Sequence, residues 1–274
     1  MSRFCTVHTH STHCDGADTL AEMARAAYAA GAVSFGASGH SHTPLAADEG
    51  CVLPADMADY RAEVLQLRTE YAGRMDVLLG LELDNCADVA PEGLDYWIAS
   101  VHNLRGNDGK SYGIDWSAGE LDSCCREGFE GNFLIMAGDY YDEVRRMAAM
   151  CPTILGHIDL ITKFNEKVPR FDEEDPRYRS AALDALHATD PGETLLEINT
   201  GAMFRGYRKT PYPALFLLRE WRNMGGKIIL TSDAHSTTAI VSGYKEAAEL
   251  ARGAGYERSA VLAGGGRIEY PLPG

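Results

Sequence analysis

The chain has 274 residues, 45% of them hydrophobic, and a formal net charge of −15. This length and apolar content suit one core, so we expect a single domain over residues 1–274. The negative charge disfavours a nucleic-acid polymer as partner, because the phosphates would be repelled. No apolar run is long enough to cross a membrane and the first residues do not resemble a signal peptide, so we expect a cytoplasmic protein with no membrane partner. The oligomeric state stays open.

Short apolar runs alternate with helical patterns along the chain. Strands are predicted at residues 4–8, 32–38, 75–83, 96–101, 152–157, 194–199 and 227–232. Helices are predicted at 19–31, with a cap at Asp18, and at 54–71, 132–150, 175–189, 211–224 and 240–252, and the longest loop at 103–120. Repeated strand–helix units predict a parallel sheet in an α/β fold, either open or closed as a barrel. No glycine-rich phosphate loop follows the first strand, which disfavours a nucleotide-binding sheet.

Metal-ligating residue types recur at the predicted strand ends. His8 and His10 are two residues apart, so on a strand they face the same side and form half of a metal site. The other strand-end candidates are Asp15, His40, Glu82, His102, His157, Asn199, Asp233 and His235. The carboxyl ends of parallel strands meet at one edge, where ligands bind. Each residue alone is explained by ordinary hydrogen bonding, but together they indicate a metal centre, since uncompensated buried imidazoles and carboxylates are costly.

Apart from Asn199, these candidates are nine ligands. One ion takes about four to six, so we expect two or three divalent ions that share a bridging carboxylate. Mixed nitrogen and oxygen ligands suit Zn, Mn or Fe without choosing among them. His187 falls in a helix and is expected to be structural. The seven cysteines show no paired spacing, which predicts reduced thiols, and Cys14 is expected to pack beside the histidines rather than bind metal.

At these residues the chain resembles the PHP (polymerase and histidinol phosphatase) superfamily. The matching motifs are His8-Thr9-His10-Ser11 with Asp15-Gly16, then His40, Glu82, His102, His157 and Ser232-Asp233-Ala234-His235. Residues 36–40, 80–84, 100–102, 156–160, 197–200 and 211–213 look like the histidinol-phosphate phosphatase branch. One departure concerns Asp15-Gly16, because that branch often has a histidine just after the position of Asp15. The dipeptide resembles phosphodiesterase-like members, and His13 could replace or assist the missing histidine.

The resemblance implies a distorted, TIM-like (β/α)7 barrel with a trinuclear site at the carboxyl ends of the strands. It assigns one ion to His8, His10, Glu82 and Asp233. It assigns a second ion to Glu82, His102 and His157, and a third to Asp15, His40 and His235. No role is assigned to His42.

The activity implied is a metal-dependent phosphomonoesterase that converts L-histidinol phosphate to L-histidinol and phosphate in histidine biosynthesis, through a metal-activated hydroxide. Catalytic roles fall to Glu82, Asp233 and His235, the last as a proton donor or a plain ligand. Cations that follow the predicted strands are expected to bind the phosphate, although each could be a solvated surface charge: Arg205, Arg208 and Lys163. The cationic end of the substrate would suit Asp84, Asp159 or Glu166.

Other functions stay open. A PHP phosphodiesterase or nucleotidase acting on small nucleotides or other phosphoesters is favoured by Asp15-Gly16. A degenerate module that stores metal or regulates is disfavoured by the complete ligand set. A hydrolase of C–N bonds on a similar barrel usually carries a bridging lysine, and no lysine occurs at a strand end in the ligand layer.

Overall fold

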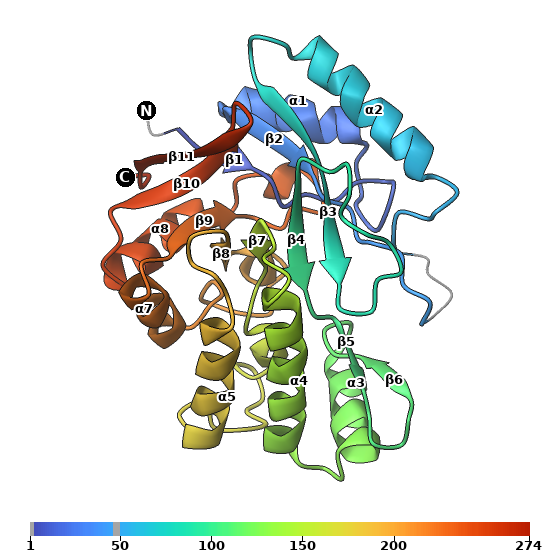
Figure 1. Cartoon of the computed structure of the whole chain (residues 1–274), viewed down its shortest axis with the longest axis vertical. Helices are drawn as coiled ribbons and strands as arrows, with labels where there is room; N and C mark the ends of the chain where they lie inside the picture. Colours follow the sequence, from blue (N-terminus) through green and yellow to red (C-terminus); the bar gives the residue numbers. More distant parts are fainter. Residues whose placement is uncertain (1–2, 46–49) are drawn as a thin grey trace.

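A curled, mixed sheet surrounded by helices forms the computed structural model, which describes residues 3–45 and 50–274 (Figure 1). The nine strands follow the order β1-β2-β3-β4-β7-β8-β9-β10-β11, and neighbours are parallel except for β10 and β11. All seven predicted strands are present. The bounds are β1 (Cys5–Thr6), β2 (Ser34–Ala37), β3 (Asp76–Asp84), β4 (Tyr96–Ser100), β7 (Ile154–Leu155), β8 (Leu195–Asn199), β9 (Lys227–Thr231), β10 (Arg258–Ala263) and β11 (Gly266–Pro271).

The six predicted helices are also present, with shifted starts. They are α1 (Leu20–Ala30), α2 (Met57–Glu70), α4 (Phe133–Ala148), α5 (Pro176–His187), α7 (Leu215–Asn223) and α8 (Tyr244–Gly253). The cap predicted at Asp18 is wrong, because the Thr19 side chain accepts from the Glu22 amide and Asp18 instead accepts from the Thr237 amide. Helix α7 starts four residues late, since the backbone of Tyr212 pairs with that of Asn199.

The loop predicted at 103–120 is wrong for half of its length. It contains the hairpin of β5 (Asn103–Arg105) and β6 (Ser111–Gly113) and the start of α3 (Ala118–Ser123). Other elements without a predicted counterpart are β10, β11 and α6 (Gly201–Phe204), and the short segments η1 (Cys124–Gly128), η2 (Leu160–Thr162) and η3 (Thr237–Ala239). Gly109, Gly264 and Gly265 have positive φ in the two hairpin turns, so these glycines were the available signal.

The segments that follow β1 and β9 meet where the cluster of histidines begins. Thr9, beyond β1, forms a parallel bridge with Ala234, beyond β9, and the amide of His10 donates to the Ala234 carbonyl at 2.8 Å. In Figure 1 the arrowheads of β3 and β4 point toward the β5–β6 hairpin and α3. The strand ends and the segments that follow them therefore gather on one side of the sheet.

Inside the curl, side chains change from apolar to polar toward the strand ends. A small inner cluster takes residues from strands around the whole sheet: Cys5, Val7, Tyr96, Ile98, Ile154, Leu195, Ile229, Ala260, Val261 and Leu262. Because side chains alternate along a strand, the next inward position lies two residues on. These positions are polar at Ser100, Glu197 and Thr231. The apolar layer therefore forms the floor beneath a buried polar layer.

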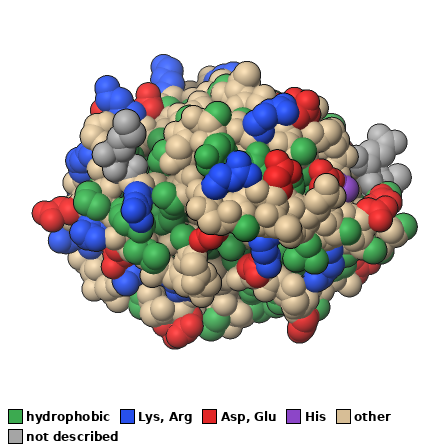
Figure 2. Space-filling model, turned by 90° about the horizontal axis from the view of Figure 1, so that it is seen from above, with side chains coloured by type: hydrophobic (Ala, Val, Ile, Leu, Met, Phe, Trp, Pro, Cys, Tyr) green, Lys and Arg blue, Asp and Glu red, His purple; other side chains and the backbone are tan. Residues whose placement is uncertain are grey.

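The outer surface carries charges of both signs. On the face shown in Figure 2, basic and acidic side chains are interspersed. Among the residues that the structure describes, no helix has both the length and the apolar character needed to cross a bilayer.

We predict that the hydroxyl of Tyr96 stabilises the inner face of the sheet. It donates to the carbonyl of Val7 at 2.6 Å and lies 3.1 Å from that of Ala37. Tyr96→Phe should lower the free energy of unfolding by about 1–3 kcal/mol, because buried carbonyls lose a donor. Urea denaturation of the metal-free protein measures this. Tyr270→Phe is the control, since that hydroxyl contacts only the exposed Arg3 in the described structure, and equal losses for both variants would contradict the prediction.

Candidate metal centre

The Glu82 carboxylate, near the end of β3, is the centre of the histidine cluster. Its side chain is 1% exposed. Its Oε2 lies 3.1 Å from His8 Nε2, 3.5 Å from His10 Nε2 and 3.1 Å from His40 Nδ1. Its Oε1 lies 3.3 Å from His102 Nε2 and 2.9 Å from His157 Nε2. One carboxylate therefore faces five imidazoles, the arrangement expected of a shared metal ligand.

Asp233 follows β9 on a backbone with φ of 48°, a left-handed conformation that is rare for a non-glycine residue. Its Oδ1 lies 3.3 Å from His10 Nε2 and 3.7 Å from His8 Nε2. A Cβ added to Gly201 would lie 2.6 Å from the Asp233 carboxylate, so a side chain there would displace it. The backbone strain and the glycine together place this carboxylate against the first histidine pair.

Asp15 closes the exposed side of the cluster. Its Oδ2 lies 3.1 Å from His235 Nε2, and its Oδ1 lies 3.5 Å from His10 Nδ1 and 3.7 Å from His40 Nε2. The side chains of Asp15, His40 and His235 are 35%, 26% and 25% exposed, whereas those of His8 and His10 are fully buried. The cluster therefore has a buried inner part and a solvent-facing outer part.

All nine predicted ligands come together. Four sets have ligand atoms within 4.8 Å of one another: His10 with Asp15, His40 and His235; His8 with His10 and Asp233; His8 with Glu82 and His157; and His40 with Glu82 and His102. Buried atoms without a hydrogen-bond partner include His8 Nε2, His10 Nε2 and Glu82 Oε2. Unpaired buried atoms of this kind are costly unless a cation joins them. The residues therefore fit divalent metal ions.

Cys14 is not part of any of these sets. Its Sγ lies 3.6 Å from His10 Nδ1, and it packs against the apolar core. Burial raises the pKa of its thiol to about 11, which disfavours the thiolate that binds metal.

Two further carboxylates orient the histidines from behind. Glu197 on β8 accepts from His8 at Nδ1 (2.5 Å), from the His157 amide (2.7 Å) and from Thr231 Oγ1 (2.7 Å). Asp84 lies 3.1 Å from His102 Nδ1. Such partners fix the orientation of a ligating imidazole and raise its basicity. Glu197 had a sequence signal, because it lies two residues before the strand-end Asn199, but no ligand role was assigned to it.

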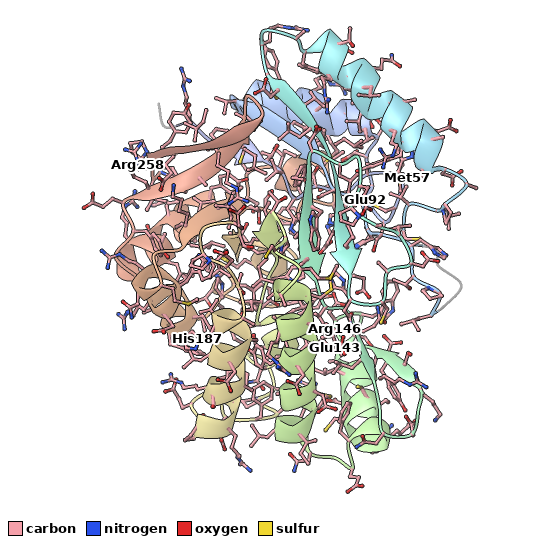
Figure 3. All side chains as sticks on the ribbon, viewed as in Figure 1. Met57, Glu92, Glu143, Arg146, His187 and Arg258 are labelled. Atoms are coloured by element: carbon pink, nitrogen blue, oxygen red, sulfur yellow. The ribbon has the colours of Figure 1, made fainter. Side chains whose placement is uncertain are left out.

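The segment that follows Asp84 is held by helix α4. The side-chain amide of Asn85 donates to Glu143 at 3.0 Å, and Arg146 donates to the Asn85 carbonyl at 3.2 Å. Glu143 and Arg146 lie together on this helix beside the end of β3 in Figure 3. The contacts fix the chain just after Asp84, which lies beside His102.

A cavity of about 150 Å³ opens onto the cluster. It is lined by Asp15, His40, Glu82, His102, Asp115, Trp116, His157, Leu160, Lys163, Arg205, Tyr207, Asp233 and His235. Acidic, imidazole and cationic groups thus share one small space with three apolar or aromatic side chains. Asp115 and Trp116 come from the segment predicted as a long loop, which carried no motif.

Two of the three predicted phosphate-binding cations line this cavity. Arg205 donates to Asp233 Oδ2 at 2.9 Å, and Lys163 Nζ lies 3.0 Å from Asp115 Oδ2. Arg208 does not line it, because its buried guanidinium donates to the hydroxyl of Thr162 and stacks on Tyr212 at 4.5 Å. Its placement does not fit direct contact with a phosphate.

The acidic residues expected to meet the cationic end of the substrate also lie outside the cavity lining. Asp84 contacts His102, Asp159 accepts from the Ala214 amide at 2.8 Å, and Glu166 accepts from the Lys209 amide at 2.8 Å. That expectation is not supported, because none of these three carboxylates lines the cavity. Asp115 is the additional acid that reaches the cavity.

A model of the PHP domain matches residues 6–201, well over half of the chain. The chain belongs to the PHP domain family. The matched segment includes seven of the nine candidate ligands, and Asp233 and His235 lie beyond it. The sequence resemblance to this family is confirmed.

Curated relatives of this PHP protein include histidinol-phosphatases. The Deinococcus radiodurans protein named "Probable histidinol-phosphatase" is 30% identical over 272 residues, covering 93% of this chain and 95% of the relative. The "Histidinol-phosphatase" of Bacillus subtilis is 26% identical, covering 87% of this chain and 96% of the relative. The resemblance to the histidinol-phosphatase branch is therefore confirmed as well.

Two solved structures share the fold. HisK of Listeria monocytogenes has a TM-score of 0.73 at 21% identity and covers 88% of this chain and 98% of its own. The histidinol phosphate phosphatase of Lactococcus lactis, complexed with zinc, L-histidinol and phosphate, has a TM-score of 0.68 at 21% identity. This second match covers 97% of this chain and 98% of that one. At this identity the likeness concerns the fold alone.

In the histidine cluster, the neighbouring carboxylates shift the pKa values of the imidazoles. Burial opposes protonation of His8, but Glu197 and Glu82 outweigh it and raise its pKa well above the ordinary value. The pKa values of His40 and His102 are also raised against burial, mainly by Glu82. Burial and the imidazoles of His235 and His40 lower the pKa of His10 to about 3. In the metal-free protein, protons therefore occupy several places where metal would bind.

We predict that protons compete with metal at this centre. Metal takes the neutral imidazole, so raised pKa values at His8, His40 and His102 mean that affinity falls as the pH falls. As the pH falls from the alkaline side toward the ordinary imidazole pKa of about 6.5, zinc affinity should weaken by about tenfold per pH unit for each displaced proton. Competition against a chromophoric chelator at each pH measures this. An affinity independent of pH over this interval would contradict the prediction.

Proposed function

We propose that this protein is a metal-dependent phosphomonoesterase that hydrolyses L-histidinol phosphate to L-histidinol and phosphate, a reaction of histidine biosynthesis. The observation that carries the proposal is the cavity, which joins seven of the nine candidate ligands to Arg205 and Lys163. The names of the curated relatives over nearly the whole chain support the substrate.

The proposal also covers the number of metal ions, the closure of the barrel and the extent of the domain. Three divalent ions would be held by the sets that the family resemblance implies, with Glu82 shared between two of them, and Zn, Mn and Fe all suit these ligands. The set of His10, Asp15, His40 and His235 supports the third of these ion sites, and the set of His8, His10 and Asp233 supports the first. The curled sheet would be a distorted (β/α)7 barrel, supported by the bridge of Thr9 to Ala234. Residues 1–274 would be one domain, since strands from Cys5 to Pro271 share one sheet.

When bound, the ions supply a nucleophilic hydroxide and neutralise the phosphoryl oxygens. The protein's own cations add to this, because Arg205 and Lys163 reach the cavity from two different loops. Arg205 Nη1 also lies 3.0 Å from His235 Nδ1, so it orients the ring that we propose as proton donor or ligand. Asp115 and Trp116 offer a carboxylate and an aromatic face for the ammonium and imidazole groups of histidinol.

A comparison of phosphoester substrates tests the proposal. Metal-loaded protein should release phosphate from L-histidinol phosphate far faster than it cleaves bis-p-nitrophenyl phosphate. Malachite green detection of phosphate, beside elemental analysis of the same sample, measures this. Preference for the diester would instead support the phosphodiesterase reading of Asp15-Gly16.

We predict that Arg205 stabilises the developing charge on the phosphoryl group. Arg205→Ala should lower kcat/KM for L-histidinol phosphate by roughly 10²–10³-fold, the usual effect of removing one such donor. Arg205→Lys should keep part of the activity, because it keeps the charge without the planar fork. The control is Lys209→Ala, an exposed cation nearby that does not line the cavity. Equal activity in Arg205→Ala and the control would contradict the role, provided that both retain their metal.

A further inference from the structure

His13 lies beside the metal cluster but faces helix α2. Its Nε2 is 2.8 Å from Glu63 Oε2, and its ring packs edge-on against Tyr60 with centroids 5.4 Å apart. The sequence left open that His13 replaces or assists a ligand, yet none of the four ligand sets includes it. The partner of this imidazole is therefore a carboxylate on α2.

His13 and Asp15 leave the same tight turn toward different partners. The amides of Cys14 and Gly16 both donate to the carbonyl of Ser11, at 2.9 and 3.0 Å. A Cβ at Gly16 would lie 2.4 Å from the Ser11 nitrogen, so the turn requires glycine there. This compact backbone links His13 to Asp15, two residues later.

Asp15, His40 and His235 make up what we call the outer site. Their side chains are a quarter to a third exposed, while those of Glu82 and Asp233 are 1% and 7% exposed. Exposed ligand side chains move more freely, and water competes with them for the ion. The affinity of an ion at the outer site therefore depends most on how firmly its ligands are held in place. Asp15 supplies the only carboxylate of this site among the described ligand sets.

We propose that Glu63, acting through His13, is a positioning residue for the outer site. Its hydrogen bond restrains the turn and keeps Asp15 Oδ2 near His235 Nε2, at 3.1 Å. Helix α2 is a suitable anchor, because the Tyr60 hydroxyl donates to the Gly80 carbonyl at 2.9 Å and accepts from the Gly39 amide at 3.3 Å. These glycines precede Glu82 and His40. The inference rests on the metal cluster of the proposed function.

Zinc titration of the metal-free protein against a chromophoric chelator tests this inference. Glu63→Ala should weaken the weakest-bound ion by about 10–100-fold, the usual effect of removing a partner of a ligand shell, and leave the tighter ions unchanged. Glu63→Gln keeps an acceptor oxygen and should stay near the wild-type affinity. Glu70→Ala is the matched control, because Glu70 lines the same groove beside α2 as Glu63 and should change nothing.

The pair should also act as a unit. His13→Ala should weaken the same ion as Glu63→Ala, and the double variant should be no weaker than either single one. Additive effects, equal affinities in Glu63→Ala and Glu70→Ala, or equal weakening of all ions with a lower Tm of the metal-free protein would overturn the inference. A wild-type protein without an outer ion would overturn it too.

The outcomes separate this inference from the proposed function. Loss of the outer ion in Glu63→Ala, in a protein that does not hydrolyse L-histidinol phosphate, would support the positioning role and contradict the substrate. Full activity of the wild-type protein with unchanged zinc affinity in Glu63→Ala would do the reverse.

Discussion

The structure of the site depends on one buried carboxylate, Glu82, which faces five imidazoles. A carboxylate that is 1% exposed is stable only when charge or hydrogen bonds compensate it. Ser100 supplies one hydrogen bond at 2.6 Å to Oε1, while Oε2 has no hydrogen-bond partner in the described structure. The unpaired oxygen favours the binding of a cation. Imidazoles from four separate segments lie around this carboxylate.

The curl of the sheet stabilises this buried polar cluster by placing an apolar layer beneath it. Apolar residues such as Ile98 and Leu195 fill the floor of the interior, and the positions two residues further on carry Ser100 and Glu197. The apolar layer excludes water from beneath the cluster, which strengthens every interaction above it. Glu197 then fixes the His8 ring from behind, so the inner ligands are placed before any ion binds.

The outer part of the cluster follows a different design. Asp15 lies on a short turn rather than on a strand, and its side chain is 35% exposed. The turn departs from the pattern of the histidinol-phosphate phosphatase branch at the same place. A histidine–carboxylate pair, His13 with Glu63, lies next to that departure. Under the proposed positioning role, restraint by helix α2 would compensate for the weaker enclosure of this outer site.

The strand–helix repeat and the nine candidate ligands can be predicted from the order of residues along the chain. This is possible because strand ends recur at regular intervals and parallel strands bring their carboxyl ends together. Which charged side chains reach the cavity depends instead on how the folded chain packs. Arg208 packs on Tyr212 and Asp159 accepts from a backbone amide, whereas Asp115 lies just after the β5–β6 hairpin, in a segment without a motif. The direction of a loop side chain depends on packing against residues that are distant in sequence. The local sequence pattern does not predict that packing.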